Sequence, residues 1–310
     1  MLEPSLYLEA MASAAIVSAA CVLAITALRR PASTTWLNLA SIPGIGLGLV
    51  TGYHMLAWRW ILPPVNGLDR FLIIVVPATL VIELIAGFPA VPRWLAWLLR
   101  MSLASMIPRI LLHGSVHLSG SNSTPWQAVA VMGIAALFLV ISWSLLALLS
   151  QRSRGVPIVL ALYLATQCAG LTIMMAGYIK GGAAACPLAA ILVAAALWTY
   201  LAGSGRFATA PSISPAVLGI GIVGLFGLLL IGIFFGRISI VSGLVMLLAP
   251  LLCWITQISW LRHRQGWVVG SMGLLLVALP LLIVLLKAKH DFDRDMAPLL
   301  GKGKASVLQH

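Results

Sequence analysis

Seven stretches of the chain contain no lysine, arginine, aspartate or glutamate, and each is long enough to cross a lipid bilayer as a helix. These stretches are residues 10–28, 31–58, 155–179, 181–205, 207–236, 238–261 and 265–286. A helix needs about 20 apolar residues to span the hydrocarbon core. Only 8% of the 310 residues are charged, against about a quarter in soluble proteins. The sequence therefore predicts an all-α fold, a polytopic integral membrane helix bundle.

Charge and turn clusters between the apolar runs divide the chain into about ten predicted spans. The predicted spans are residues 7–28, 36–57, 71–88, 93–112, 126–149, 157–179, 183–202, 215–235, 241–261 and 266–286. Residues 1–286 are thus expected to form one transmembrane domain with short loops, and residues 287–310 a short polar C-terminal tail. If the span at 93–112 failed to cross, every later helix would change direction. Four prolines within spans are expected to bend them, namely Pro77, Pro187, Pro250 and Pro280.

The loops between the spans carry unequal numbers of basic residues. Eight arginines fall in alternate loops, called the arginine-rich loops below: Arg29, Arg30, Arg93, Arg152, Arg154, Arg206, Arg262 and Arg264. The opposite short loops hold four basic residues, Arg59, Arg70, Lys180 and Arg237. Because short basic loops stay in the cytoplasm, this bias predicts both termini outside. The five basic residues of the C-terminal tail favour the reverse orientation.

The net charge of +12 has a membrane explanation. The basic residues occur singly or in twos between apolar runs, which is the spacing of topology signals and headgroup contacts. The expected partner is the lipid bilayer and not a nucleic acid. The expected location is a membrane crossed many times, which in a bacterium would be the inner membrane.

Glu83 and Arg100 are the most informative pair of ionisable residues. Glu83 lies eight residues before the middle of the turn at 89–93, and Arg100 lies nine residues after it. On two antiparallel helices these positions reach a similar depth, so the side chains are predicted to meet. Charges inside a membrane usually pair or face a cavity. The pair is therefore either an intramembrane ion pair that locks a helical hairpin or a gate for a solute.

Two further groups of polar residues are candidates for pathway or interfacial positions. Arg109, His113 and His117 lie four residues apart and would share one helical face if the helix continued past Gly114. A basic stripe at the headgroups is favoured over a metal site, because no Asp, Glu or Cys in the segment completes a ligand set. His54 is a lone histidine near the end of its span, and an interface residue is favoured there too.

A stripe of small residues follows one face of the second predicted span. Gly44, Gly48 and Gly52 are spaced four apart, which lets two helix backbones approach closely. The stripe is interpreted as helix packing. Glycine-rich helices of this kind could also join the chain to a copy of itself or to another protein.

The function remains open between three classes. A permease-like protein that moves a small solute is favoured by the number of spans, the proline- and glycine-bearing helices and the buried pair. The alternative is a non-catalytic membrane subunit or scaffold of a larger envelope complex. A membrane enzyme acting on lipid through His113 and His117 is least favoured, because paired-aspartate, GxSG, HExxH and P-loop motifs are missing. No cofactor or metal is expected. A polar cavity around Glu83 would favour transport, and a solid core there would favour the subunit.

Overall fold

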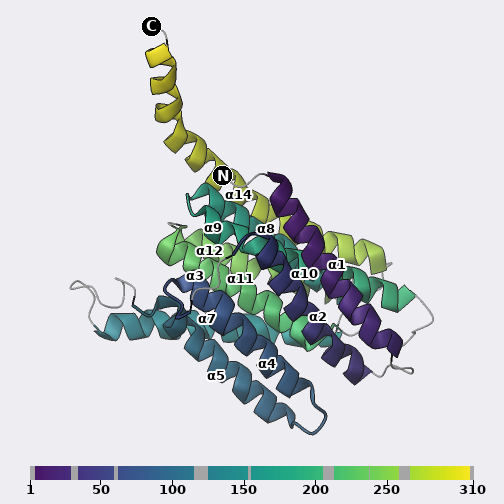
Figure 1. Ribbon diagram of the computed structural model, residues 1–310. Coiled ribbons are helices and arrows are strands. Elements are labelled where there is room, and N and C mark those ends of the chain that lie inside the picture. Colours follow the sequence, from purple (N-terminus) through teal and green to yellow (C-terminus); the bar gives the residue numbers. More distant parts are fainter. Residues whose placement is uncertain are drawn as a thin grey trace.

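The computed structural model describes residues 4–28, 34–58, 62–114, 125–152, 155–204, 213–236, 238–257 and 266–307, and all regular structure in these ranges is helical. The helices are α1 (Pro4–Leu28), α2 (Thr34–Met55), α3 (Gly67–Arg70), η1 (Phe71–Val75), α4 (Val76–Gly87), α5 (Arg93–Leu112), α7 (Pro125–Arg152), α8 (Val156–Met175), α9 (Ile179–Ala183), α10 (Ala185–Ser204), α11 (Pro215–Phe235), α12 (Ile240–Leu248), η2 (Ala249–Gln257) and α14 (Gly266–Val307). They form a bundle (Figure 1). The predicted fold class is confirmed.

Nine helical segments of the described residues are long and apolar enough to cross a membrane. They are Ser5–Ala27, Gly67–Gly87, Arg93–Leu112, Trp126–Arg152, Val156–Met175, Ile179–Leu201, Pro215–Phe235, Ile240–Gln257 and Val268–Asp295. They correspond to nine of the ten predicted spans. The remaining one is α2, a helix of 22 residues that packs against α1 and α10. Its glycines, Asn38 and His54 lower its hydropathy.

Helix α11 occupies the centre of the bundle (Figure 1). Every residue from Ala216 to Gly232 is buried, and α8, α4, α7, α10, α2 and α5 all pack against this helix. The surrounding helices instead present large apolar side chains outward, among them Leu8, Ile16, Leu197 and Leu275. Such a surface is stable in lipid and would aggregate in water. The molecule is therefore a multi-pass membrane protein.

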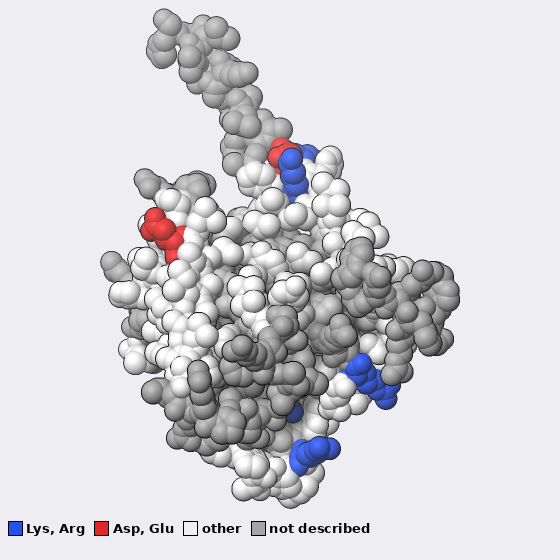
Figure 2. Space-filling view, turned by 90° about the vertical axis from the view of Figure 1, so that its right-hand side faces the viewer, with Lys and Arg blue, Asp and Glu red and all other residues white. Residues whose placement is uncertain are grey.

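The charged side chains on one face of the molecule lie toward its two ends. Figure 2 shows blue and red atoms at the base of the projecting tail, a red patch at the upper left and blue atoms toward the lower right, while the described surface between them is uncharged. An uncharged band between charged ends is the arrangement that a hydrocarbon layer between two headgroup layers requires.

Two of the four prolines within spans coincide with a change of helix type. The segment Gly67–Gly87 contains the π-helical turn η1 just before Pro77, and the segment Ile240–Gln257 changes from α to 3₁₀ geometry at Ala249 and Pro250. Proline lacks the N–H that continues an α-helix and its ring clashes with the carbonyl four residues earlier. Pro187 and Pro280 lie within the α-helices α10 and α14.

Helix α14 is 42 residues long and extends beyond the apolar stretch at its beginning. The predicted polar tail, from residue 287 to Val307, continues the same helix and projects clear of the bundle (Figure 1). We call residues 287–307 the α14 extension. Its side chains from Lys289 to Asp295 are exposed.

Candidate functional site

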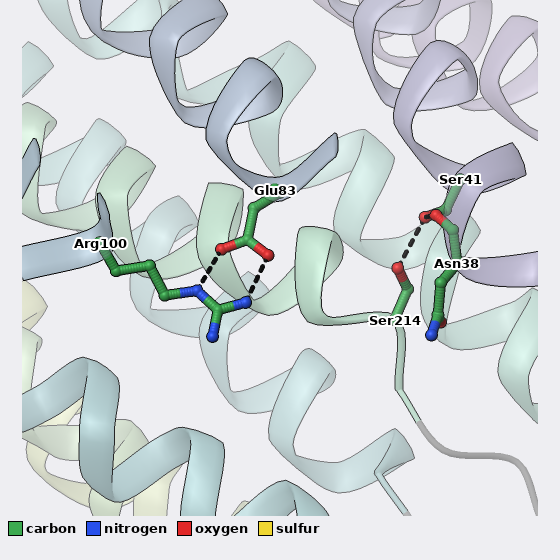
Figure 3. A network of polar contacts seen from close by, with 5 residues as sticks. All are labelled: Asn38, Ser41, Glu83, Arg100 and Ser214. Atoms are coloured by element: carbon green, nitrogen blue, oxygen red, sulfur yellow. Dashed lines mark hydrogen bonds and ion pairs between the residues drawn. The ribbon is translucent and has the colours of Figure 1, made fainter. Parts of the chain in front are cut away.

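Glu83 and Arg100 meet across the hairpin that α4 and α5 form. The Arg100 Nε donates to Glu83 Oε1 at 2.7 Å, and the Nη2 donates to Oε2, also at 2.7 Å. Both carboxylate oxygens are therefore used by one planar guanidinium, which is the strongest form of such a pair. Figure 3 shows the two side chains reaching toward each other from neighbouring helices.

The pair is buried but lies toward one end of the bundle. The Glu83 side chain is 1% exposed and the Arg100 side chain 12%. At a rise of 1.5 Å per residue, Glu83 is about 6 Å from the end of α4 at Gly87, and Arg100 is about 10 Å from the start of α5 at Arg93. Both residues therefore lie nearer to the turn that joins α4 to α5 than to the far ends of these helices.

Two tryptophans complete the surroundings of Arg100. Its guanidinium carbon lies 5.3 Å from the centre of the Trp97 ring and 5.9 Å from the centre of the Trp143 ring. Trp97 precedes Arg100 by about one helical turn, whereas Trp143 comes from α7 and is 2% exposed. The indole faces attract a cation within this range. The arginine charge is thus met by the carboxylate and by two aromatic rings.

A glycine of the central helix makes the space that Glu83 occupies. A Cβ atom on Gly219 would lie 2.9 Å from Glu83 Oε1 and 3.1 Å from its Cδ. Glu83 therefore lies directly against the backbone of α11. Sequence reasoning did not identify Gly219, Trp97 or Trp143 as part of this site. Gly219 and Gly227 are eight residues apart on one face of α11, and that spacing was the available signal, since Gly227 similarly faces Phe71.

A second polar contact lies at the same end of α11. Ser41 Oγ donates to the carbonyl oxygen of Asn38 at 2.7 Å, and it is also 2.7 Å from Ser214 Oγ. Because Ser41 has one hydroxyl proton, Ser214 is the donor between the two serines. Ser214 is the N-cap residue of α11, so this bond attaches the start of α11 to α2 (Figure 3). Together the two contacts clamp one end of the central helix.

The other predicted site residues are not brought together with this pair. His54 is exposed in the last turn of α2, and Arg109 and His113 are exposed at the end of α5. The stripe that would include His117 required the helix to continue past Gly114. It does not, because α5 ends at Leu112 and Gly114 has a positive φ of 69°. His117 itself lies outside the described residues.

The glycine stripe of α2 faces helices of the same chain. A Cβ on Gly44 would lie 2.8 Å from Val22 Cγ2, and one on Gly48 would lie 2.7 Å from the carbonyl oxygen of Ala14. Gly52 is in equally close contact with Pro187 of α10. The stripe therefore serves the packing of α2 on α1 and α10.

One apolar cavity among the described residues is lined by neither Glu83 nor Arg100. It has no room for a water molecule. Its lining residues come from α2, α8, α10 and α11: Ile45, Thr166, Leu188, Ile191, Leu192, Ile220, Gly221, Gly224 and Leu225. Thr166, the one polar side chain, donates to the carbonyl oxygen of Leu162 at 2.8 Å. Water cannot enter a small apolar void of this kind.

The described part of the chain contains no group of three or more His, Cys, Asp or Glu residues that could hold a metal ion. Its four cysteines are free thiols, Cys21, Cys168, Cys186 and Cys253, and the last three are buried. No protein-family model, no curated protein and no solved structure matches this chain.

Proposed function

We propose that the protein is a non-catalytic membrane subunit that assembles with a further component of a cell envelope complex. The observation that carries the proposal is the α14 extension. It continues the helix to Val307 and projects from the bundle (Figure 1), and its described side chains from Lys289 to Asp295 are exposed. Most helical stability in proteins comes from tertiary packing. A helical stretch whose described side chains, Lys289 to Asp295, are all exposed is best explained by a partner.

The chemistry of the extension fits a protein partner. Lys287, Lys289, Asp291 and Asp293 are exposed, and they stand beside Phe292, which is 38% exposed. Charges of both signs around an apolar ring offer specific polar contacts and one apolar anchor, the composition of a protein interface rim and core. A lipid surface would favour basic residues alone.

The state of the buried pair supports a structural role for the charges. Both oxygens of Glu83 are bound by Arg100, and the nearest backbone of α11 leaves no space beside the carboxylate. A solute pathway would need polar groups that face water or the solute. The pair instead joins α4 to α5 and rests on α11, as expected of a fixed element of the scaffold.

The proposal is tested on protein solubilised from its own host membranes in mild detergent. The full chain is compared with a truncation after Leu286, which removes the extension, and with a control truncation after Val307. We expect the full chain and the control to run in a particle of defined stoichiometry with a second polypeptide. The shorter chain should run alone with unchanged helix content and thermal unfolding. A full chain that runs alone, or a particle that survives removal of the extension, contradicts the proposal.

A permease is the second candidate, and one observation favours it. Two spans, Gly67–Gly87 and Ile240–Gln257, are interrupted by the non-α segments η1 and η2. In transporters the substrate site is typically formed by such discontinuous helices. Purified protein in liposomes should then raise the flux of protons, sodium, potassium or a labelled amino acid above that of empty vesicles. Glu83→Gln should abolish this flux, whereas Glu9→Gln, at an exposed position of α1, should not. No flux of any of these probes counts against transport.

A further inference from the structure

The span formed by α12 and η2 changes its helical pitch halfway along its length. Residues Ile240–Leu248 are α-helical, and residues Ala249–Gln257 continue without a break as a 3₁₀ helix. Runs of 3₁₀ helix longer than three or four residues are uncommon, because their hydrogen bonds are poorly aligned. Nine residues in this form therefore need an explanation.

Pro250 accounts for the beginning of the 3₁₀ run. It has no N–H to donate, and in an α-helix its ring would meet the carbonyl of Met246. This effect reaches about one turn. The rest of the run, through Gln257, has no further proline or glycine, so local sequence alone does not impose it.

Contacts with neighbouring helices hold the rest of η2. Trp254 Nε1 donates to the carbonyl oxygen of Leu145 on α7 at 3.3 Å. Thr256 Oγ1 donates to the carbonyl oxygen of Cys253, three residues earlier, at 2.6 Å. The Thr256 methyl group lies in the space left by Gly273 of α14, where a Cβ would come within 2.8 Å of it. Residues three apart line up on a 3₁₀ helix, and the bond from Thr256 to Cys253 joins two such residues.

The alternative α form would have a different length and a different rotation. Nine residues rise about 18 Å at 2.0 Å per residue and about 13.5 Å at 1.5 Å per residue. Conversion to α would therefore shorten the span by about 4 to 5 Å. The change from 3.0 to 3.6 residues per turn would also rotate the far end by about half a turn. Trp254 and Thr256 would both leave their present partners.

We propose that η2 is a two-state segment that interconverts between the 3₁₀ form and an α form. In the 3₁₀ form the Trp254 ring lies over the last turn of α7, where the Arg152 guanidinium carbon is 5.8 Å from its centre. In the α form the Trp254 ring no longer contacts the Arg152 guanidinium group, and the Arg152 side chain lies among the lipid headgroups. The segment thereby couples the length of one span to the exposure of a charge at the end of another. The inference rests on η2 alone and applies equally to a subunit and to a carrier.

Spin labels at Val241 and Gln257 measure the length of this span in lipid nanodiscs, in a chain whose partly exposed Cys21 is replaced by alanine. The separation along the axis is about 28 Å for the structure described and about 24 Å for an all-α span. A label pair at Met272 and Leu286, on the α-helical part of α14, serves as the control.

We expect two populations in the unsubstituted chain, with the longer separation dominant. Pro250→Ala restores an N–H donor, and Trp254→Phe deletes the bond to Leu145 while keeping a ring. Both should enlarge the shorter population, and the α14 control pair should not change. A single long separation that neither substitution alters overturns the proposal, as does a single short separation in the unsubstituted chain. Trp254→Phe keeps the test decisive if Pro250→Ala does not fold.

Discussion

The sharpest test of the buried pair is to remove one charge at a time. Glu83→Gln leaves the Arg100 cation with a neutral partner, and Arg100→Gln leaves the Glu83 carboxylate against the backbone of Gly219. Breaking a buried ion pair on one side costs about 3 to 5 kcal/mol. The Arg100 side chain keeps 12% exposure and two indole faces, so we expect about 3 kcal/mol for Glu83→Gln. The loss for Arg100→Gln should be larger, because the Glu83 side chain is only 1% exposed.

The double substitution separates a coupled pair from two independent residues. Two neutral amides can still bond to each other, so replacing both residues should cost less than the Arg100→Gln change alone, and the coupling free energy should be at least about 2 kcal/mol. The measurement is the free energy of unfolding in mixed micelles, followed by far-ultraviolet circular dichroism. Losses that add within about 0.5 kcal/mol would falsify the argument, because residues that do not interact behave additively.

Three further expectations follow from particular contacts. Gly48→Ala should lower the unfolding temperature, because the new Cβ would lie 2.7 Å from a backbone carbonyl oxygen that cannot move aside. Gly46→Ala is the control and should leave the unfolding temperature unchanged, because its Cβ would lie 3.6 Å from a leucine methyl group. Equal effects of the two substitutions on the unfolding temperature would contradict this. Single cysteines in the arginine-rich loops should resist an impermeant thiol reagent in intact cells, and labelling there would reverse the orientation. Burial, and then the charge of Asp69, raise the pKa of Tyr178. The unfolded chain ionises this phenol near pH 10 and the folded chain only at higher pH, so stability should fall as the pH rises above 10, and Tyr178→Phe should lessen the fall.

The meeting of Glu83 and Arg100 could be predicted from the sequence because it is local. A short turn joins two helices of known rise, so equal distances from the turn imply equal depth. Trp143 and Ser214 could not be found in the same way. They come from helices distant in the sequence, and their approach depends on how α7 and α11 are placed around the hairpin.

The ends of helices are a second feature that the sequence did not predict. The stripe of Arg109, His113 and His117 requires the helical period to continue, but α5 ends at Leu112, His113 has a non-helical backbone with a ψ of 130°, and Gly114 has a positive φ. The glycine stripe of α2 packs closely against other helices, but the spacing of the glycines alone does not say which helix packs there. The structure places α1 against Gly44 and Gly48.

The sequence by itself determined that the chain crosses a membrane many times and approximately where the crossings lie. Charged residues are costly in hydrocarbon, so long uncharged apolar runs in the sequence mark the spans. Only the tertiary structure decided which helix is central. The most apolar 18-residue windows of the segments Pro215–Phe235 and Val268–Asp295 have the same mean hydropathy of 2.7, yet 89% of the first window and 22% of the second is buried. Lipid tails are as apolar as a protein interior, so hydropathy separates membrane from water and cannot separate the centre of a bundle from its rim.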